Sequence, residues 1–261
     1  MIDITPPPIA DDGPDTLQPV ETTRDAVFEG RIVVLQSRAG YRFSIDAILL
    51  AHRVARLAPR RGLEVGGGCG VISLCVSRLS PGYSGVAVEV QTSLVHVACL
   101  NVLQNDLADR LEIIHGDIRE VAPKMRPALF DVVFMNPPYF HPSRGHVNPN
   151  SERAAARHQI HGNIAELITA ARALLEPRGT LELVYPTTSS FEVIAALEAV
   201  GLRALQIRYV FSDITQDSKL CLISARQAGH PSLRIDPPLV LYDAPEVYTR
   251  EVREMLAGGQ F

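Results

Sequence analysis

The stretch "LEVGGGCGV", residues 63–71, places glycines at alternate positions after a short apolar segment. Apolar residues with helical spacing then run over 71–79. Glycine allows a backbone to turn tightly and to approach a ligand closely. The stretch therefore predicts a strand over 62–65, a helix over 71–79, and between them a turn at Gly66, Gly68 and Gly70. From the glycines alone, a turn without a ligand is an equal alternative.

The chemistry around this turn limits the kind of ligand. The spacing is GxGxG, whereas GxGxxG is the spacing that places a pyrophosphate on a helix N-terminus. Glu64 precedes the glycines, and its carboxylate would repel a phosphate. A carboxylate suits the amino group of a zwitterionic ligand better, so we expect Glu64 to contact such a group.

Two further acidic residues lie at the ends of predicted strands, Glu89 near the end of the strand over 86–90 and Asp117 just beyond the next one. Glu89 lies in "VAVEV" (86–90), about 20 residues beyond the glycines, where an acid can hold a ribose diol. Asp117 follows the strand predicted over 111–115 and suits either an adenine amino group or the cap of a turn. A surface carboxylate is the alternative for Glu89. Three such signals at three successive strand ends predict an adenosyl ligand without phosphate.

The stretch "FMNPPYF", residues 134–140, ends a fourth apolar run at 130–135. Proline lacks the N–H that a central strand needs, so the strand must stop at Asn136. The Asn136 side-chain oxygen and nearby backbone carbonyls are acceptors that can hold both hydrogens of a planar NH2 group. Tyr139 and Phe140 then offer flat faces to a heterocycle. A proline-terminated strand with a core aromatic is the alternative.

Strands and helices alternate along most of the chain. Further strands are predicted over 29–36, 180–185 and 202–211, with late strands over 220–225 and 239–242, and further helices over 44–57, 93–104, 164–175 and 191–200. Such alternation builds an α/β protein with a mostly parallel sheet and helices on both faces. Ligands bind beyond the carboxyl ends of its strands. We expect a flexible tail over 1–20, an N-terminal strand and helix extension over 21–61, and the ligand-binding domain over 62–261.

Composition excludes several classes of protein. The 261 residues carry a formal net charge of −4 and are 46% hydrophobic, as in a soluble globular protein rather than a globally basic nucleic-acid binder. No apolar run reaches the roughly 18 residues of a membrane helix. The four cysteines have no CxxC pairing, which favours a reducing cytoplasm, and the histidines between 141 and 161 have no spacing typical of a metal site. No metal is therefore expected.

Together, these motifs resemble the class I S-adenosylmethionine-dependent methyltransferases that methylate amino groups and carry an "NPPY" signature, here residues 136–139. The usual Asp of the glycine motif is Glu64 here. The resemblance implies a Rossmann-like fold with a mostly parallel seven-stranded sheet and a late antiparallel strand. It implies S-adenosylmethionine as cofactor, held by Glu64, Gly66, Gly68, Gly70, Glu89, Asp117 and Asn136.

Three further stretches point to one substrate group within this class. They are "GYRFSIDAILLA" (40–51), "ARH" (156–158) and "LVLYDAPEVYTREVREML" (239–256). They are similar to the bacterial tRNA adenine N6-methyltransferases, which act on the adenine beside the anticodon of a valine tRNA. Family members often have Gly-Thr where this chain has Ser44-Ile45, ahead of Asp46. The resemblance covers about residues 29–256.

This narrower resemblance implies roles for particular residues. Asp46 would contact the cofactor. Asn136 and the carbonyl of Pro137 would hold the reacting amine while Tyr139 stacks on the base, and Phe140, Arg153, Arg157 and His158 would contact RNA. Three alternatives stay open: the same chemistry on a protein glutamine, another RNA or DNA; a cofactor-binding protein without catalysis; and a nicotinamide dehydrogenase.

Overall fold

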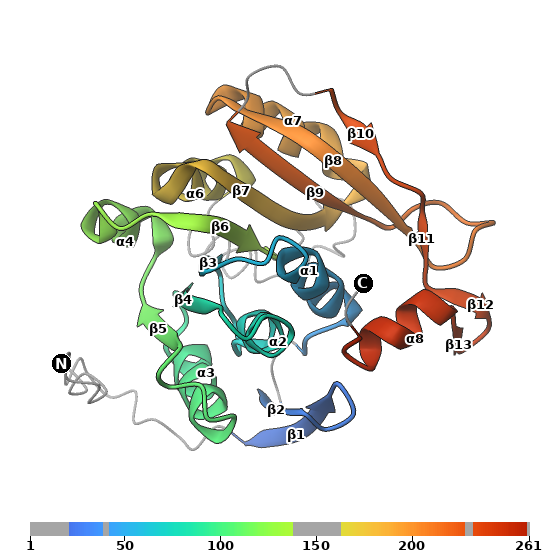
Figure 1. Ribbon diagram of the computed structural model, residues 1–261, viewed down its shortest axis with the longest axis horizontal. Helices are drawn as coiled ribbons and strands as arrows, with labels where there is room; N and C mark the ends of the chain where they lie inside the picture. Colours follow the sequence, from blue (N-terminus) through green and yellow to red (C-terminus); the bar gives the residue numbers. More distant parts are fainter. Residues whose placement is uncertain (1–20, 39–41, 138–162, 228–231, 260–261) are drawn as a thin grey trace, which may run out of the picture.

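The computed structural model describes residues 21–38, 42–137, 163–227 and 232–259 (Figure 1). One nine-stranded sheet runs through the molecule in the order β10-β8-β9-β7-β6-β3-β4-β5, with β11 also paired to β8. Its strands are β3 (Arg61–Val65), β4 (Ser84–Glu89), β5 (Leu111–His115), β6 (Phe130–Met135), β7 (Leu175–Pro186), β8 (Leu202–Phe211), β9 (Leu220–Gln227), β10 (Arg234–Ile235) and β11 (Leu239–Val240).

Two layers of helices cover the sheet and bury two hydrophobic cores. On one face α1 (Ile45–Ala55), α2 (Val71–Leu79) and α8 (Arg250–Leu256) share a core with the hairpin of β1 (Thr22–Val27) and β2 (Ile32–Ser37), and α3 (Thr92–Gln104) contributes Val102. On the other face lie α4 (Ile118–Met125), α6 (Ile164–Leu174) and α7 (Ser190–Ala199). A short helix η1 (Thr187–Ser189) precedes α7, and β12 (Tyr242–Ala244) pairs with β13 (Val247–Tyr248).

The predicted doubly covered α/β fold is confirmed, including its antiparallel strand. The seven strands β3 to β9 form the body of the sheet, and β9 runs antiparallel to both β7 and β8. The other pairings among these seven strands are parallel. The two short strands β10 and β11 extend the sheet beyond the seven that were expected.

The structure departs from the sequence predictions most clearly at three places. The strand predicted over 29–36 begins later, as β2 at Ile32, because Phe28, Glu29 and Gly30 adopt left-handed backbone angles in the turn that joins it to the unpredicted strand β1. The late strand over 239–242 is divided between β11 and β12. Helix α4 was not predicted, since Pro123 lies inside it and its sequence is short and polar.

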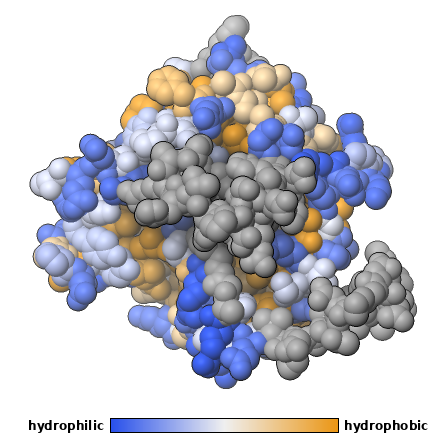
Figure 2. Space-filling view, turned by 180° about the vertical axis from the view of Figure 1, so that it is seen from behind, coloured by the Kyte–Doolittle hydropathy of each residue, from blue (hydrophilic) through white to orange (hydrophobic). Residues whose placement is uncertain are grey.

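The surface of the molecule carries both polar and apolar side chains. On the face that Figure 2 shows, hydrophilic and hydrophobic residues are interspersed over the visible side chains. Within the described ranges, no helix is both long and apolar enough to cross a membrane.

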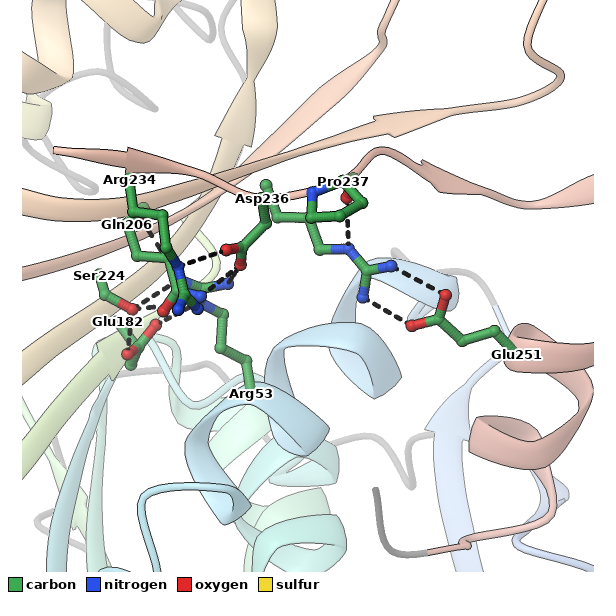
Figure 3. Close-up of polar contacts among 9 residues, drawn as sticks. Arg53, Glu182, Gln206, Ser224, Arg234, Asp236, Pro237 and Glu251 are labelled. Carbon is green, nitrogen blue, oxygen red and sulfur yellow. Dashed lines mark hydrogen bonds and ion pairs between the residues drawn. The ribbon is translucent and has the colours of Figure 1, made fainter.

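A buried ion pair joins α1 to the sheet (Figure 3). The Arg53 guanidinium donates through Nε to Glu182 of β7 at 2.8 Å and through Nη2 to the hydroxyl of Ser224 on β9 at 2.7 Å. Ser224 in turn donates to the second oxygen of Glu182. Burial raises the pKa of Glu182, and the positive charge of Arg53 opposes this shift. Arg53 is therefore the principal counter-charge of this buried carboxyl group.

The same cluster extends to the edge of the sheet. Asp236, which follows β10, lies 3.8 Å from Nη1 of Arg53 and accepts from Arg234 at 2.9 Å. Next to it, the Arg208 guanidinium of β8 forms a bidentate ion pair with the Glu251 carboxylate of α8. These contacts connect α1, α8 and the late strands, which Figure 3 shows converging on one region.

Replacing Arg53 is expected to destabilise the fold strongly. Arg53→Met leaves Glu182 buried without its counter-charge, which typically costs about 3–5 kcal/mol in the free energy of unfolding. Equilibrium unfolding in urea measures this loss. Arg203→Met is the matched control, because Arg203 pairs with Glu198 on the exposed surface and should cost no more than about 1 kcal/mol. Equal losses for the two variants would contradict the prediction, whereas Arg53→Met combined with Glu182→Leu should regain most of the stability.

Candidate active site

The site begins with the register of four neighbouring parallel strands. Val65 of β3 lies opposite Val88 of β4 and opposite Met135 of β6. Glu89 of β4 lies opposite His115 of β5. Glu89 ends β4, and the glycine turn, Asp117 and Asn136 come just after the ends of β3, β5 and β6, so all four lie at one edge of the sheet, as the sequence predicted. This is the edge where ligands bind in open parallel sheets.

The glycine turn has the backbone that only glycine adopts without strain. The φ angles of Gly66, Gly68 and Gly70 are +73°, +55° and +83°. A Cβ atom at Gly66 or Gly68 would meet none of the described residues within 4 Å, so these two glycines serve the conformation of the turn rather than packing against that part of the chain. The amides of Gly66 and Gly67 donate to the Val88 carbonyl at 2.9 and 3.1 Å, which fixes the turn to β4. Among the described residues, no atom therefore packs at these two Cβ positions, which suits the close approach of a ligand.

Glu89 is joined to the turn by its carboxylate. One oxygen accepts from the Gly68 amide at 2.8 Å, and the other accepts from the Gln91 amide at 2.9 Å. The side chain is 5% exposed. A carboxylate has about four acceptor positions, and these two bonds leave room for two more. The residue fits the expected grip on a ribose diol, and that role stays a prediction.

Glu64 lies in the interior, next to the turn. It is 1% exposed and accepts from the Ser73 amide at 3.0 Å and from the Ser73 hydroxyl. Ser73 is in the first turn of α2, so Glu64 satisfies an N-terminal amide of that helix from the end of β3. Burial raises the pKa of Glu64 to about 8, the Ser73 hydrogen bonds oppose this shift, and the negative charge of Glu89 adds to it. A contact of Glu64 with a ligand's amino group stays a prediction.

Asp117 is the N-cap of α4. Its side chain accepts from the Arg119 amide at 2.9 Å and forms an ion pair with the Arg119 guanidinium. Arg119 also pairs with Glu166 of α6 at 2.8 Å. The capping alternative weighed from the sequence is confirmed, while a contact with an adenine amino group stays a prediction.

Asn136 and Pro137 follow the central strand β6 directly. Asn136 is half-buried and Pro137 is buried, so this strand end is fixed by its surroundings. Asp46, implied as a cofactor contact, lies in the first turn of α1, where it is buried and accepts from the Ser44 hydroxyl. The expected Tyr139, Phe140, Arg153, Arg157 and His158 lie outside the described residues.

Sequence reasoning missed one residue of this region. Asn101 of α3 is fully buried and donates to the Cys69 carbonyl in the glycine turn at 2.8 Å. The available signal was a second asparagine four residues on, Asn105, because polar residues at i and i+4 on an otherwise apolar helix face indicate buried hydrogen bonds.

Comparison with known proteins agrees with this geometry. The family model of the methyltransferase small domain matches residues 42–202, which is more than half of the chain. The chain belongs to the methyltransferase small domain family. The residues at this edge fit the cofactor of this class. The glycine turn allows the close approach of a ligand, and the Glu89 carboxylate lies next to it. The turn lacks the GxGxxG spacing that binds a pyrophosphate. The cofactor is S-adenosylmethionine.

Several curated relatives share one name, tRNA1(Val) (adenine(37)-N6)-methyltransferase. That of Shewanella frigidimarina is 31% identical over 169 residues, covering 63% of this chain and 66% of the relative. That of Vibrio cholerae is 30% identical, covering 64% and 68%, and one from Bacteroides fragilis is 27% identical, covering 65% and 71%. The chain thus matches about two thirds of the length of these relatives.

Solved structures share the fold. A predicted O-methyltransferase of Agrobacterium tumefaciens superposes with a TM-score of 0.65 at 22% identity, covering 83% of this chain and 98% of that one. The TYW2 protein of M. jannaschii, solved in complex with AdoMet, gives a TM-score of 0.54 at 15% identity, covering 78% and 84%.

The buried carboxyl of Glu64 predicts a pH dependence of stability. Its pKa is raised in the folded state from an ordinary 4.5 to about 8, so the folded protein holds a proton that the unfolded chain has lost. Stability is therefore full below about pH 4.5 and falls as the pH rises towards 8, by up to about 1.4 kcal/mol per pH unit. Glu64→Gln should flatten this slope between pH 5 and 8 in urea unfolding. An unchanged slope in the variant would show that Glu64 titrates normally.

Proposed function

We propose that the protein transfers a methyl group from S-adenosylmethionine to the exocyclic N6 amine of an adenine in tRNA, as a cytoplasmic enzyme. The observation that carries the proposal is Asn136–Pro137 at the end of β6, the strand paired directly with the β3 that leads into the glycine turn. An amine held there would lie at the same sheet edge as the cofactor. The names of the relatives support tRNA adenine as the substrate, and the adenine beside the anticodon of a valine tRNA is the position proposed.

The cofactor supplies a methyl group on a sulfonium, which is already activated for transfer. The chain's own residues then have to bind and orient the two reactants, because holding them in line converts a bimolecular reaction into an effectively unimolecular one. Glu89 and the glycine turn would hold the adenosyl part, and Asp46 and Glu64 lie on the elements that flank it. A fixed turn and a fixed strand end suit this role.

Asn136 and Pro137 would prepare the nucleophile. The lone pair of an adenine N6 amine is delocalised into the ring, which makes this nitrogen a weak nucleophile. Two acceptors, the Asn136 side-chain oxygen and the Pro137 carbonyl, would take hydrogen bonds from the two N–H groups and draw the nitrogen towards tetrahedral geometry. The same acceptors would stabilise the positive charge that develops on nitrogen during transfer.

The part of the chain after Pro137 would meet the RNA. Tyr139 and Phe140 would stack on the target base, and Arg153, Arg157 and His158 would contact the RNA backbone. An anticodon loop already presents unstacked bases, so the cost of extruding the target adenine is small.

Removing the Asn136 amide is expected to reduce methyl transfer far more than it weakens cofactor binding. We expect Asn136→Ala to lower kcat by about 100-fold or more, by analogy with the loss of one transition-state hydrogen bond. The assay incubates the protein with methyl-labelled S-adenosylmethionine and bacterial tRNA, and identifies the labelled nucleosides by mass. The expected product is N6-methyladenosine from the unsubstituted protein only.

The control is the dissociation constant of S-adenosylhomocysteine for both proteins, because Asn136 is also an expected cofactor contact; the loss of kcat should exceed any loss of cofactor affinity. No labelled nucleoside in any tRNA, despite cofactor binding by the unsubstituted protein, would overturn the tRNA assignment. Ribosomal RNA, DNA and glutamine-containing proteins are then the substrates to assay, because the same two acceptors can hold any planar NH2 group.

A further inference from the structure

Asn101 of α3 connects the glycine turn to the N-terminal hairpin. Its side-chain nitrogen donates to the Cys69 carbonyl of the turn at 2.8 Å and to the Leu35 carbonyl of β2 at 2.9 Å. Its side-chain oxygen accepts from the Leu35 amide at 2.7 Å and from Gln104 at 2.9 Å. The amide thus makes four hydrogen bonds while it is 0% exposed. A buried amide with all four bonds formed holds its partners in one arrangement.

Asn105, one helical turn further along α3, binds the same strand in the same manner. Its oxygen accepts from the Val33 amide at 2.9 Å, and its nitrogen donates to the Val33 carbonyl at 2.7 Å. Its second N–H donates to the Asn101 carbonyl within α3. The two asparagines therefore make the same pair of bonds to β2, but of the two only Asn101 reaches the glycine turn.

Strand β2 carries this connection on to the entrance of α1. Gln36, 2% exposed, accepts from the Phe43 amide at 2.8 Å and donates to Asp25 of β1 at 2.8 Å. Phe43 immediately precedes Ser44 and Asp46 at the start of α1. Figure 1 shows the hairpin lying beside α2 and α3. Strand β2 is therefore hydrogen-bonded both to Asn101, which holds the glycine turn, and to Phe43, which precedes α1.

We propose that Asn101 is a positioning residue for the cofactor, and that the hairpin of β1 and β2 serves as part of the cofactor site. The inference rests on the proposed function only for the identity of the ligand. Cys69 lies between Gly68 and Gly70, so a bond to its carbonyl fixes the turn at its middle. Without that bond the turn keeps its attachment to β4 but loses its support from the hairpin side.

The matched substitutions are Asn101→Asp and Asn105→Asp. Each replaces an NH2 by an oxygen that repels the β2 carbonyl, so both should lower the melting temperature. Only Asn101→Asp also repels the Cys69 carbonyl. We expect it to raise KM for S-adenosylmethionine and the dissociation constant of S-adenosylhomocysteine by about tenfold, the effect of a hydrogen bond worth about 1.4 kcal/mol. We expect kcat to change less than about threefold, and both constants to change less than about twofold in Asn105→Asp.

A second measurement uses the unsubstituted protein and does not depend on a variant that folds. Hydrogen exchange of the Leu35 amide, which donates to Asn101, should slow on adding S-adenosylhomocysteine. Exchange of the Val33 amide, which donates to Asn105, should slow much less. Equal protection of the two amides, or equal cofactor constants in the two variants, would overturn the inference. Absence of any cofactor binding by the unsubstituted protein would overturn the proposed function instead.

Discussion

In the parallel ladder of β4, β3 and β6, Val88, Val65 and Met135 lie side by side. This register is the constraint on which the site depends. Because all three strands point the same way, each must return through a crossover helix, and the turns that begin those crossovers meet at one sheet edge. The glycine turn, Glu89 and Asn136 are brought together by this topology, although they are spread over more than 70 residues of the chain.

Buried polar contacts hold the groups at this edge in place. Glu89 fixes the Gly68 amide, Glu64 fixes the start of α2, and Asn101 fixes the Cys69 carbonyl. Each of these groups would be costly to bury without its partner, so each contact tolerates little variation in geometry. A binding site whose groups are already in position loses little free energy to ordering when its ligand arrives.

Much of the fold was predictable from sequence because buried parallel strands have nearly continuous apolar sequences. The strands over 111–115, 130–135 and 202–211 and the helix over 71–79 were predicted with the bounds that the structure has. Strand β1 was missed because its sequence, TTRDAV, is polar and gains its structure by pairing with β2. For the site, the motifs along the sequence predicted that the ends of β3, β4, β5 and β6 would lie together. They did not predict that Glu64 turns inward to Ser73, or that Asp117 pairs with Arg119, because both partners are chosen by three-dimensional packing.

The identity of the ligand at this edge is best tested by calorimetric titration of the unsubstituted protein and of Glu89→Gln. S-adenosylhomocysteine and NAD are titrated separately into each protein. We predict that S-adenosylhomocysteine binds and that NAD does not, since the turn lacks the phosphate-binding spacing. Glu89→Gln should weaken S-adenosylhomocysteine about tenfold or more, because it replaces a charged acceptor of hydrogen bonds. Binding of NAD, or binding of S-adenosylhomocysteine that is unaffected by Glu89→Gln, would contradict an adenosyl site built on the glycine turn and Glu89.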